Sequence, residues 1–215
     1  MLAATILGMT TTRTRPQWRV PAALVLLSFV PALAGTVRVA QLTGGAQVTP
    51  DNARFFATPV PVVAHIVGAT VFCVLGAFQF VPTLRRRSWH RVAGRIILPC
   101  GLTAALSGLW MALFLAPPAD DGGLLIGFRL VFGSGMAIAL VLAFVAVRRR
   151  DFRVHRAWMM RAYAIGIGAG SQAVIGGIWL AAVGKPGDVT WALLLAAGWV
   201  VNLVVAETVI RKEKS

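Results

Sequence analysis

Two of the three histidines in this sequence are spaced in a way that could hold a cofactor. His90 and His155 each follow a block of arginines and each open a long apolar run. Two neutral imidazoles at one depth in a helix bundle can ligate the iron of a b-type haem, and arginines can hold its propionates. The same pair could instead bind a quinone or another anionic headgroup, or lie at a membrane interface without a ligand. The arginines expected around such a site are Arg91, Arg95, Arg156 and Arg161.

A second candidate pair is formed by His65 and Arg129. Each lies a few residues inside the start of an apolar run. Ionisable side chains at membrane depth are costly, which makes them candidates for a functional site. Together they could bind an anionic group that arrives from outside the cell. The alternative for Arg129 is that its guanidinium group reaches back to the lipid headgroups.

Glu207 is the acidic candidate, near the end of the last apolar run. It precedes Arg211 by four residues, the favourable order for an ion pair on a helix. It could instead accept a proton beside His155, or act as the counter-charge of the cationic site. The ligand-binding candidates are therefore His65, His90, Arg91, Arg95, Arg129, His155, Arg156 and Glu207, with His90 and His155 as metal ligands only if haem is bound.

Other familiar chemistries have no signature in the sequence. It has no nucleophile triad, phosphate-binding loop, cluster of metal ligands or pair of carboxylates, so it predicts no catalytic residue. The string "GIGAGS" at 166–171 looks like a glycine-rich nucleotide loop, but it follows no strand and lies within an apolar run. We expect these glycines to let membrane helices approach closely.

The composition indicates which elements position these residues. The chain has 215 residues, of which 58% are hydrophobic and 13% charged, whereas soluble domains have about 25% charged residues. Its apolar runs are continuous and approach or exceed the roughly 20 residues that a membrane helix needs. We therefore predict an all-α polytopic membrane protein with a bundle of six transmembrane helices, at 20–37, 60–84, 92–115, 124–147, 157–183 and 189–210.

The basic residues predict the orientation of the bundle. The net charge of +14 does not indicate nucleic-acid binding, because the arginines form short blocks between apolar runs. Seventeen of the 21 lysines and arginines fall on the same side of the six predicted helices. Cytoplasmic loops carry such an excess, so both termini are predicted to be cytoplasmic and the protein to lie in the cell membrane. Residues 1–19 and 211–215 are then cytoplasmic segments around a transmembrane domain at 20–210.

The first apolar run has a second interpretation. Basic residues, an apolar stretch and "ALAG" at 32–35 together resemble a signal peptide with a small-residue cleavage site. We favour a membrane helix, because the run stays uncharged to Val37. Met9 is a second candidate for the start of translation.

The middle of the chain shows signs of a repeated unit. The second and third runs, like the fourth and fifth, form a helix, a basic loop and another helix. Repeated helical hairpins often create a binding site where the repeats meet. The connection at 38–59 is rich in Gly, Thr and Pro, and we expect it to be a loop or a short interfacial helix.

These motifs resemble a known family. The segments "LGAFQFVPTLRRRSWHRVAGRI" at 75–96 and "RRRDFRVHRAWMMRAYAI" at 148–165, with the histidine at 65, are similar to a bacterial family of predicted membrane proteins, domain of unknown function 2306. The resemblance covers the second to fifth runs and implies a membrane location and a shared fold, but no activity. The residues that carry it are His65, Gly76, Gln79, Phe80, His90, Arg91, Gly94, Arg95, His155, Arg156, Trp158 and Met159.

The functional hypothesis is an integral membrane protein that binds a small molecule or cofactor within its helix bundle through His and Arg side chains. One alternative is a haem-binding or quinone-linked redox protein with His90 and His155 as ligands. Another is a small-molecule carrier or an accessory subunit of a membrane complex. The lipid bilayer is the one partner that the composition itself predicts.

Overall fold

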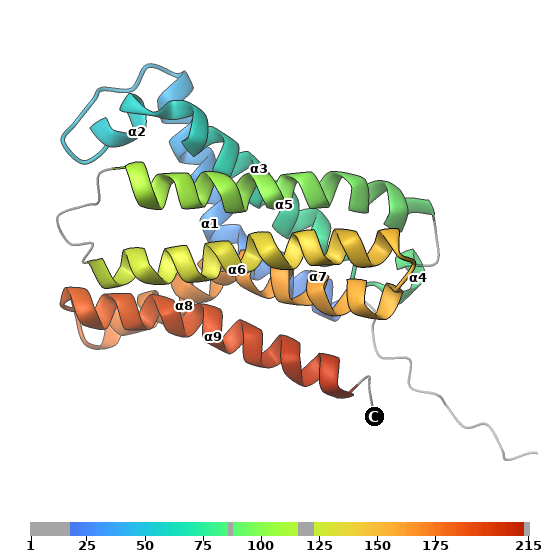
Figure 1. Ribbon diagram of the computed structural model, residues 1–215. Helices are drawn as coiled ribbons and strands as arrows, with labels where there is room; N and C mark the ends of the chain where they lie inside the picture. The colour runs from blue at the N-terminus through green and yellow to red at the C-terminus, as the bar shows by residue number, and fades with distance from the viewer. Residues whose placement is uncertain (1–17, 86–87, 116–122, 213–215) are drawn as a thin grey trace, which may run out of the picture.

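The computed structural model describes residues 18–85, 88–115 and 123–212, and in these ranges the chain is helical without strands. The predicted all-α membrane protein with six spans is confirmed, because six stretches are long and apolar enough to cross a bilayer (Figure 1). These are α1 (Arg19–Thr43), α3 (Pro59–Phe78), α5 (Ser88–Phe114), α6 (Gly123–Arg148), the pair α7 (Phe152–Gly166) and α8 (Gly168–Ala182), and α9 (Asp188–Lys212).

The first span is longer than the sequence predicted. It was expected to end at Val37, but α1 continues to Thr43. Arg38 stays within the helix, where its Nη1 donates to Gln41 Oε1 at 2.9 Å. The connection that follows contains the short helix α2 (Ala53–Ala57), so of the two predicted alternatives, a loop or a short helix, part of it is a short helix.

The second predicted span is interrupted before its end. The expected run at 60–84 divides into α3 and a short helix, α4 (Pro82–Arg85). Between them the N–H groups of Gln79, Phe80 and Val81 each donate to the carbonyl three residues earlier, as in a tight 3₁₀ turn. Pro82 has no N–H and disfavours a helical conformation at Val81, so α3 cannot continue through it.

The spans pack in a consistent order. α3 lies along α5, α5 along α6, α6 along α7, and α7 along α9. In Figure 1, α5, α6 and α9 run roughly side by side, whereas α1 and α3 cross behind them at a steeper angle. α1 packs against α3 and α8, so the first apolar run is a helix of the bundle.

The fifth span is a broken helix, whereas the sequence predicted one continuous helix at 157–183. The break lies at Ile167, between α7 and α8. Side chains from other helices donate to backbone carbonyls there. The Asn202 amide donates to Ala164 O at 3.1 Å, and the Cys73 thiol donates to Gly166 O at 3.5 Å. A break at membrane depth is tolerated because such groups satisfy the freed backbone.

Glycines at the break allow three other helices to approach it. A methyl group added at Gly170 would collide with a backbone oxygen of α1, and one at Gly168 would collide with an indole of α9. The "GIGAGS" string therefore supports close packing, as expected, and also accompanies the break. The neighbours are Phe72 for Gly166, Trp199 for Gly168 and Leu27 for Gly170.

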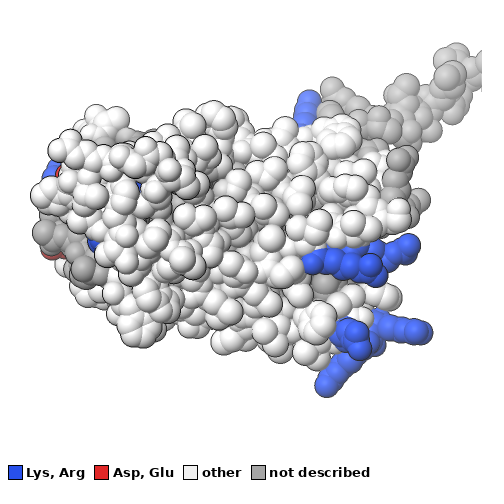
Figure 2. All heavy atoms as spheres, turned by 90° about the horizontal axis from the view of Figure 1, so that it is seen from above, with Lys and Arg blue, Asp and Glu red and all other residues white. Residues whose placement is uncertain are grey.

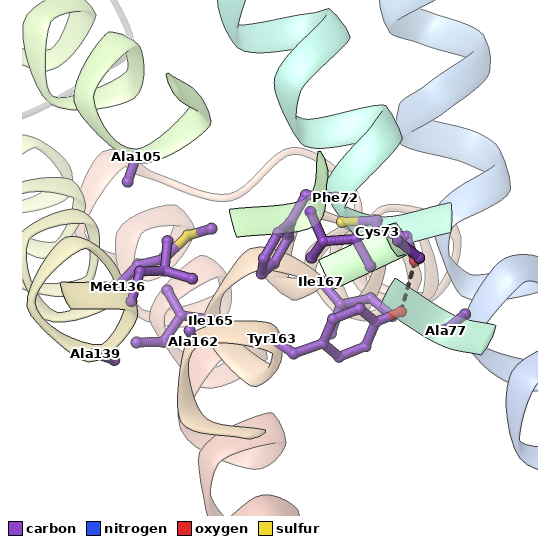
Figure 3. Packing of buried hydrophobic residues seen from close by; sticks show 13 residues of the cluster. Phe72, Cys73, Ala77, Ala105, Met136, Ala139, Ala162, Tyr163, Ile165 and Ile167 are labelled. Carbon is purple, nitrogen blue, oxygen red and sulfur yellow. Dashed lines mark hydrogen bonds between the residues drawn. The ribbon is translucent and has the colours of Figure 1, made fainter. Parts of the chain in front are cut away.

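The centre of the bundle is a cluster of buried apolar side chains from α3, α5, α6 and α7 (Figure 3). Phe72 is completely buried, and its ring lies 5.7 Å from that of Tyr163. The Tyr163 hydroxyl donates to the carbonyl oxygen of Cys73 at 2.8 Å, the bond drawn in Figure 3. This hydrogen bond lets a polar phenol lie in an apolar core and fixes α7 against α3.

The described surface is apolar along the sides of the bundle, while its charges gather at the ends (Figure 2). Basic side chains cluster at one end, where α6 ends and α7 begins. We call this the basic end and the opposite end, where α2 lies, the α2 end. The apolar sides suit contact with lipid chains, so the protein is a membrane protein. That the basic end is cytoplasmic stays a prediction. The exposed arginines there include Arg148, Arg149, Arg150 and Arg153.

Candidate functional site

A cavity of about 450 Å³ lies within the α2-end half of the bundle. It is bounded by α3, α5, α6, the broken α7–α8 pair and α9, with α2 at its shallow end. Its volume is within the range of roughly 300–1,000 Å³ of pockets that hold small ligands. Most of the described lining residues are apolar or glycine, and none is acidic. The polar lining residues are Arg54, His65, Arg129 and Gln172.

His65 has a fixed ring orientation in this cavity. Its Nδ1 lies 2.8 Å from the carbonyl oxygen of Ala104 on α5. A carbonyl oxygen only accepts, so Nδ1 carries the proton and donates it to Ala104. Gly108 makes room for the ring, because a methyl group there would lie 3.1 Å from His65 Cε1. In the neutral ring the other nitrogen, Nε2, is a hydrogen-bond acceptor.

Two arginines add positive charge to the same cavity. Arg129 lies on α6, six residues after its first residue, Gly123, and its side chain is half-buried. Arg54 lies on α2. The guanidinium carbons of Arg54 and Arg38 lie 4.5 and 4.2 Å from the centre of the Phe55 ring, close enough for cation–π attraction. These contacts tie α2 to the end of α1 and hold Arg54 at the cavity.

Gln172 and Trp199 complete the wall formed by α8 and α9. The Gln172 amide donates to Leu195 O at 2.9 Å, and Gly198 makes room for its side chain. The Trp199 indole stacks on Phe132 of α6 at 4.7 Å between ring centres. Both side chains are thus held in place before any ligand binds.

Of the ligand-binding candidates selected from the sequence, two line this cavity. His65 and Arg129 both line it, although they lie on helices that are not consecutive in the chain. Sequence reasoning missed Arg54, Gln172 and Trp199 as cavity residues. Gln172 did carry a signal as a polar residue within an apolar run, whereas Arg54 lies in a loop-like segment and Trp199 in an apolar run of ordinary composition.

The basic end has a different character. His155 Nδ1 lies 2.9 Å from the carbonyl oxygen of Ala143 on α6, and therefore donates to it. Arg161 forms a bidentate salt bridge with Glu207, in which Nε donates to Oε1 at 2.5 Å and Nη2 donates to Oε2 at 3.0 Å. The Arg161 guanidinium also lies 4.6 Å from the Trp158 ring centre. These groups join α7 to α6 and to α9.

Glu207 therefore has a counter-charge role toward one of the arginines for which it was suggested, Arg161. The hypothesis that His90 and His155 face each other gains no support. α5, which carries His90, packs along α3 and α6, whereas α7 packs along α6, α9 and α3. In the part of the chain that the structure describes, no three His, Cys, Asp or Glu side chains converge. A shared haem between His90 and His155 stays a prediction from the sequence.

The remaining candidates of the basic end lie near its surface. Arg91 and Arg95 are exposed on α5, and Arg156 is half-buried on α7. None of them lines the cavity of the α2 end. Their placement at this end agrees with contact to lipid headgroups.

Comparison with known proteins identifies the chain. The family described as predicted membrane protein (DUF2306) matches residues 62–210. The chain belongs to this family. The matched residues run from α3 to α9 and include His65 and Arg129, while α1 and α2 lie before them. No curated protein and no solved structure matches the chain. Membership in the family confirms the resemblance seen in the motifs and a membrane location, and it assigns no activity.

Proposed function

We propose that this protein binds a small anionic molecule in the cavity of the α2 end, with Arg129 and His65 as its main polar contacts. The observation that carries the proposal is that both side chains line one cavity of about 450 Å³. An anion suits a cavity whose described lining includes two arginines and a histidine. If the basic end is cytoplasmic, the cavity faces the outside of the cell.

The cost of a cation at this depth supports a ligand role for Arg129. An arginine at the centre of a membrane helix costs about 2.5–3.5 kcal/mol on insertion scales, and Arg129, six residues into α6, has part of this cost. Reaching toward the headgroups lowers this cost, but here the side chain also forms part of a cavity wall. A carboxylate or phosphate in the cavity would accept charge-assisted hydrogen bonds from the guanidinium, which are among the strongest in proteins.

His65 supplies a preorganised contact beside this charge. Its bond to Ala104 O fixes the ring, so little conformational freedom is lost when a ligand meets Nε2. A neutral ring accepts a hydrogen bond at Nε2, and a protonated ring donates one. His65 can therefore bind either a hydroxyl of the ligand or its anionic group.

The proposal is tested with the purified full chain in detergent and a panel of probe anions, namely acetate, succinate, inorganic phosphate and decanoate. Calorimetry should find binding for at least one probe. In Arg129→Leu that binding should weaken at least tenfold, or by about 1.4 kcal/mol, because removing one partner of a charged hydrogen bond costs this much or more. Insertion of this variant should be unchanged or improved.

The matched control is Arg153→Leu, which removes the same charge from an exposed position at the basic end. This variant should bind the probe as the parent protein does. Equal binding by Arg129→Leu and the parent protein would contradict the proposal, as would the absence of binding for every probe in the panel.

A further inference from the structure

The cavity is not uniform along its length. Arg54 lies on α2 at its shallow end, and Arg129 lies about 9 Å along α6 at 1.5 Å per residue. Phe72 and Met136 each lie thirteen residues into their helices, so they lie roughly 20 Å deep. The charged side chains are therefore shallow, and the walls become apolar toward the middle of the bundle.

The deep end is built to hold apolar groups. Phe72 and Met136 line this end from the buried core of the bundle. Gly166, at the break between α7 and α8, brings the backbone against both side chains. Trp199 adds an aromatic wall that is held by stacking on Phe132. Met side chains adapt to ligand shape, and aromatic walls exclude water, so this end suits a hydrocarbon chain or ring.

We infer that the ligand of this cavity is an amphiphilic anion. Its carboxylate or phosphate head lies at the shallow end with Arg54 and Arg129, and its short apolar tail points toward Phe72, Met136 and Trp199. This inference rests on the proposed function and adds the class of ligand. A small hydrophilic anion would make no contact with the apolar deep end, whereas an amphiphilic anion contacts both ends of the cavity.

The inference predicts how affinity depends on the length of the ligand's hydrocarbon tail. Burial of one methylene is worth about a fourfold gain in affinity. For alkanoates from butanoate upward, affinity should therefore rise about fourfold per methylene and then level off once the tail fills the cavity. The partition coefficient of an alkanoate into the bilayer or micelle keeps rising with tail length. A plateau in affinity therefore distinguishes binding in the cavity from partition into the surrounding lipid or detergent.

The direct test uses decanoate brominated near the end of its tail, which quenches nearby tryptophan fluorescence. The full chain is placed in nanodiscs of zwitterionic lipid. Quenching at low probe concentration should fall sharply in Trp199→Phe, because Trp199 lines the deep end. The matched control is Trp110→Phe, since Trp110 is 37% exposed on α5 and is not a lining residue. The Trp110→Phe variant should lose only the quenching that is caused by probe dissolved in the lipid.

Three further arms complete the test. Decanol, which has the tail without the charge, should compete with the brominated probe at least tenfold less well than decanoate. Arg129→Leu should remove this preference. Adding anionic phospholipid to the nanodiscs distinguishes the source of the ligand: competition indicates a membrane lipid, and its absence indicates a free amphiphilic acid. Either source agrees with the inference.

The outcomes separate this inference from the proposed function. If acetate, succinate or phosphate binds in an Arg129-dependent way but decanoate does not reach Trp199, the ligand is a hydrophilic anion and the inference is overturned while the proposed function stands. Equal competition by decanol and decanoate also overturns it. If no anion binds in an Arg129-dependent way, both fail.

Discussion

The same residue types have different surroundings at the two ends of the bundle. At each end a histidine donates from Nδ1 to a backbone carbonyl of a neighbouring helix, His65 to Ala104 and His155 to Ala143. At the basic end the nearby Arg161 is bound to Glu207 and lies over Trp158. At the α2 end His65 and Arg129 instead line a cavity.

The difference separates the prominent motifs of the sequence from the proposed site. The His-Arg pairs at 90–91 and 155–156 are the most conspicuous signatures of the sequence. Yet the described contacts of His155 join helices, and the cavity is lined by residues with no shared motif. Polar groups at a helix contact stabilise the fold, whereas polar groups around a cavity remain able to meet a ligand.

The largest effect is expected in a test of which end of the bundle faces the cytoplasm. Reporter fusions after Lys185 should show an external location, and fusions after Arg150 a cytoplasmic one, in an all-or-none manner. The reason is the excess of basic residues at the Arg150 end. A cytoplasmic signal at Lys185 would turn the cavity toward the cytoplasm and change the compartment that supplies its ligand.

Haem binding by His90 and His155 would make the basic end, and not the α2 end, the ligand-binding end of the bundle. If the basic end is structural, the absorption spectrum of the protein purified from haem-supplemented cells should have no Soret band. A Soret band that is lost in both His90→Ala and His155→Ala would instead make the basic end the cofactor site. Loss in one variant alone would indicate a different pair of ligands.

The structural role of the basic end predicts a loss of stability without a loss of binding. Glu207→Ala should lower the free energy of unfolding by about 2 kcal/mol, since it leaves the Arg161 guanidinium without this carboxylate in a partly apolar setting. Denaturant titration in micelles measures this change, with Thr208→Ala as the exposed control on the same helix. Anion binding at the α2 end should stay within experimental error of the parent protein.

The smallest expected effect compares the two histidines directly. His65→Ala and His155→Ala should each lower the free energy of unfolding by about 1 kcal/mol, because each loses one hydrogen bond to a backbone carbonyl. Only His65→Ala should also weaken anion binding, by roughly fivefold to tenfold. Equal losses of binding in the two variants would show that the effect is an indirect result of destabilisation.

The sequence prediction of the fifth span failed because neighbouring helices decide its shape. The fifth span was predicted as continuous, and its break at Ile167 accompanies three close approaches by Phe72, Trp199 and Leu27. The glycine string was a visible signal, but it indicates close packing equally well in an unbroken helix. The end of α3 was also missed, although Pro82 marked it.

The sequence by itself determined that this is an all-α membrane protein with six spans, and it singled out His65 and Arg129. These conclusions depend on local quantities, namely the length of apolar runs relative to the bilayer and the cost of a charge within them. Only the tertiary structure decided that Arg54, His65, Arg129 and Trp199 line one cavity and that Glu207 is bound to Arg161. The physical reason is that a helix's own sequence fixes where it spans, whereas the faces that meet depend on the packing of every neighbouring helix.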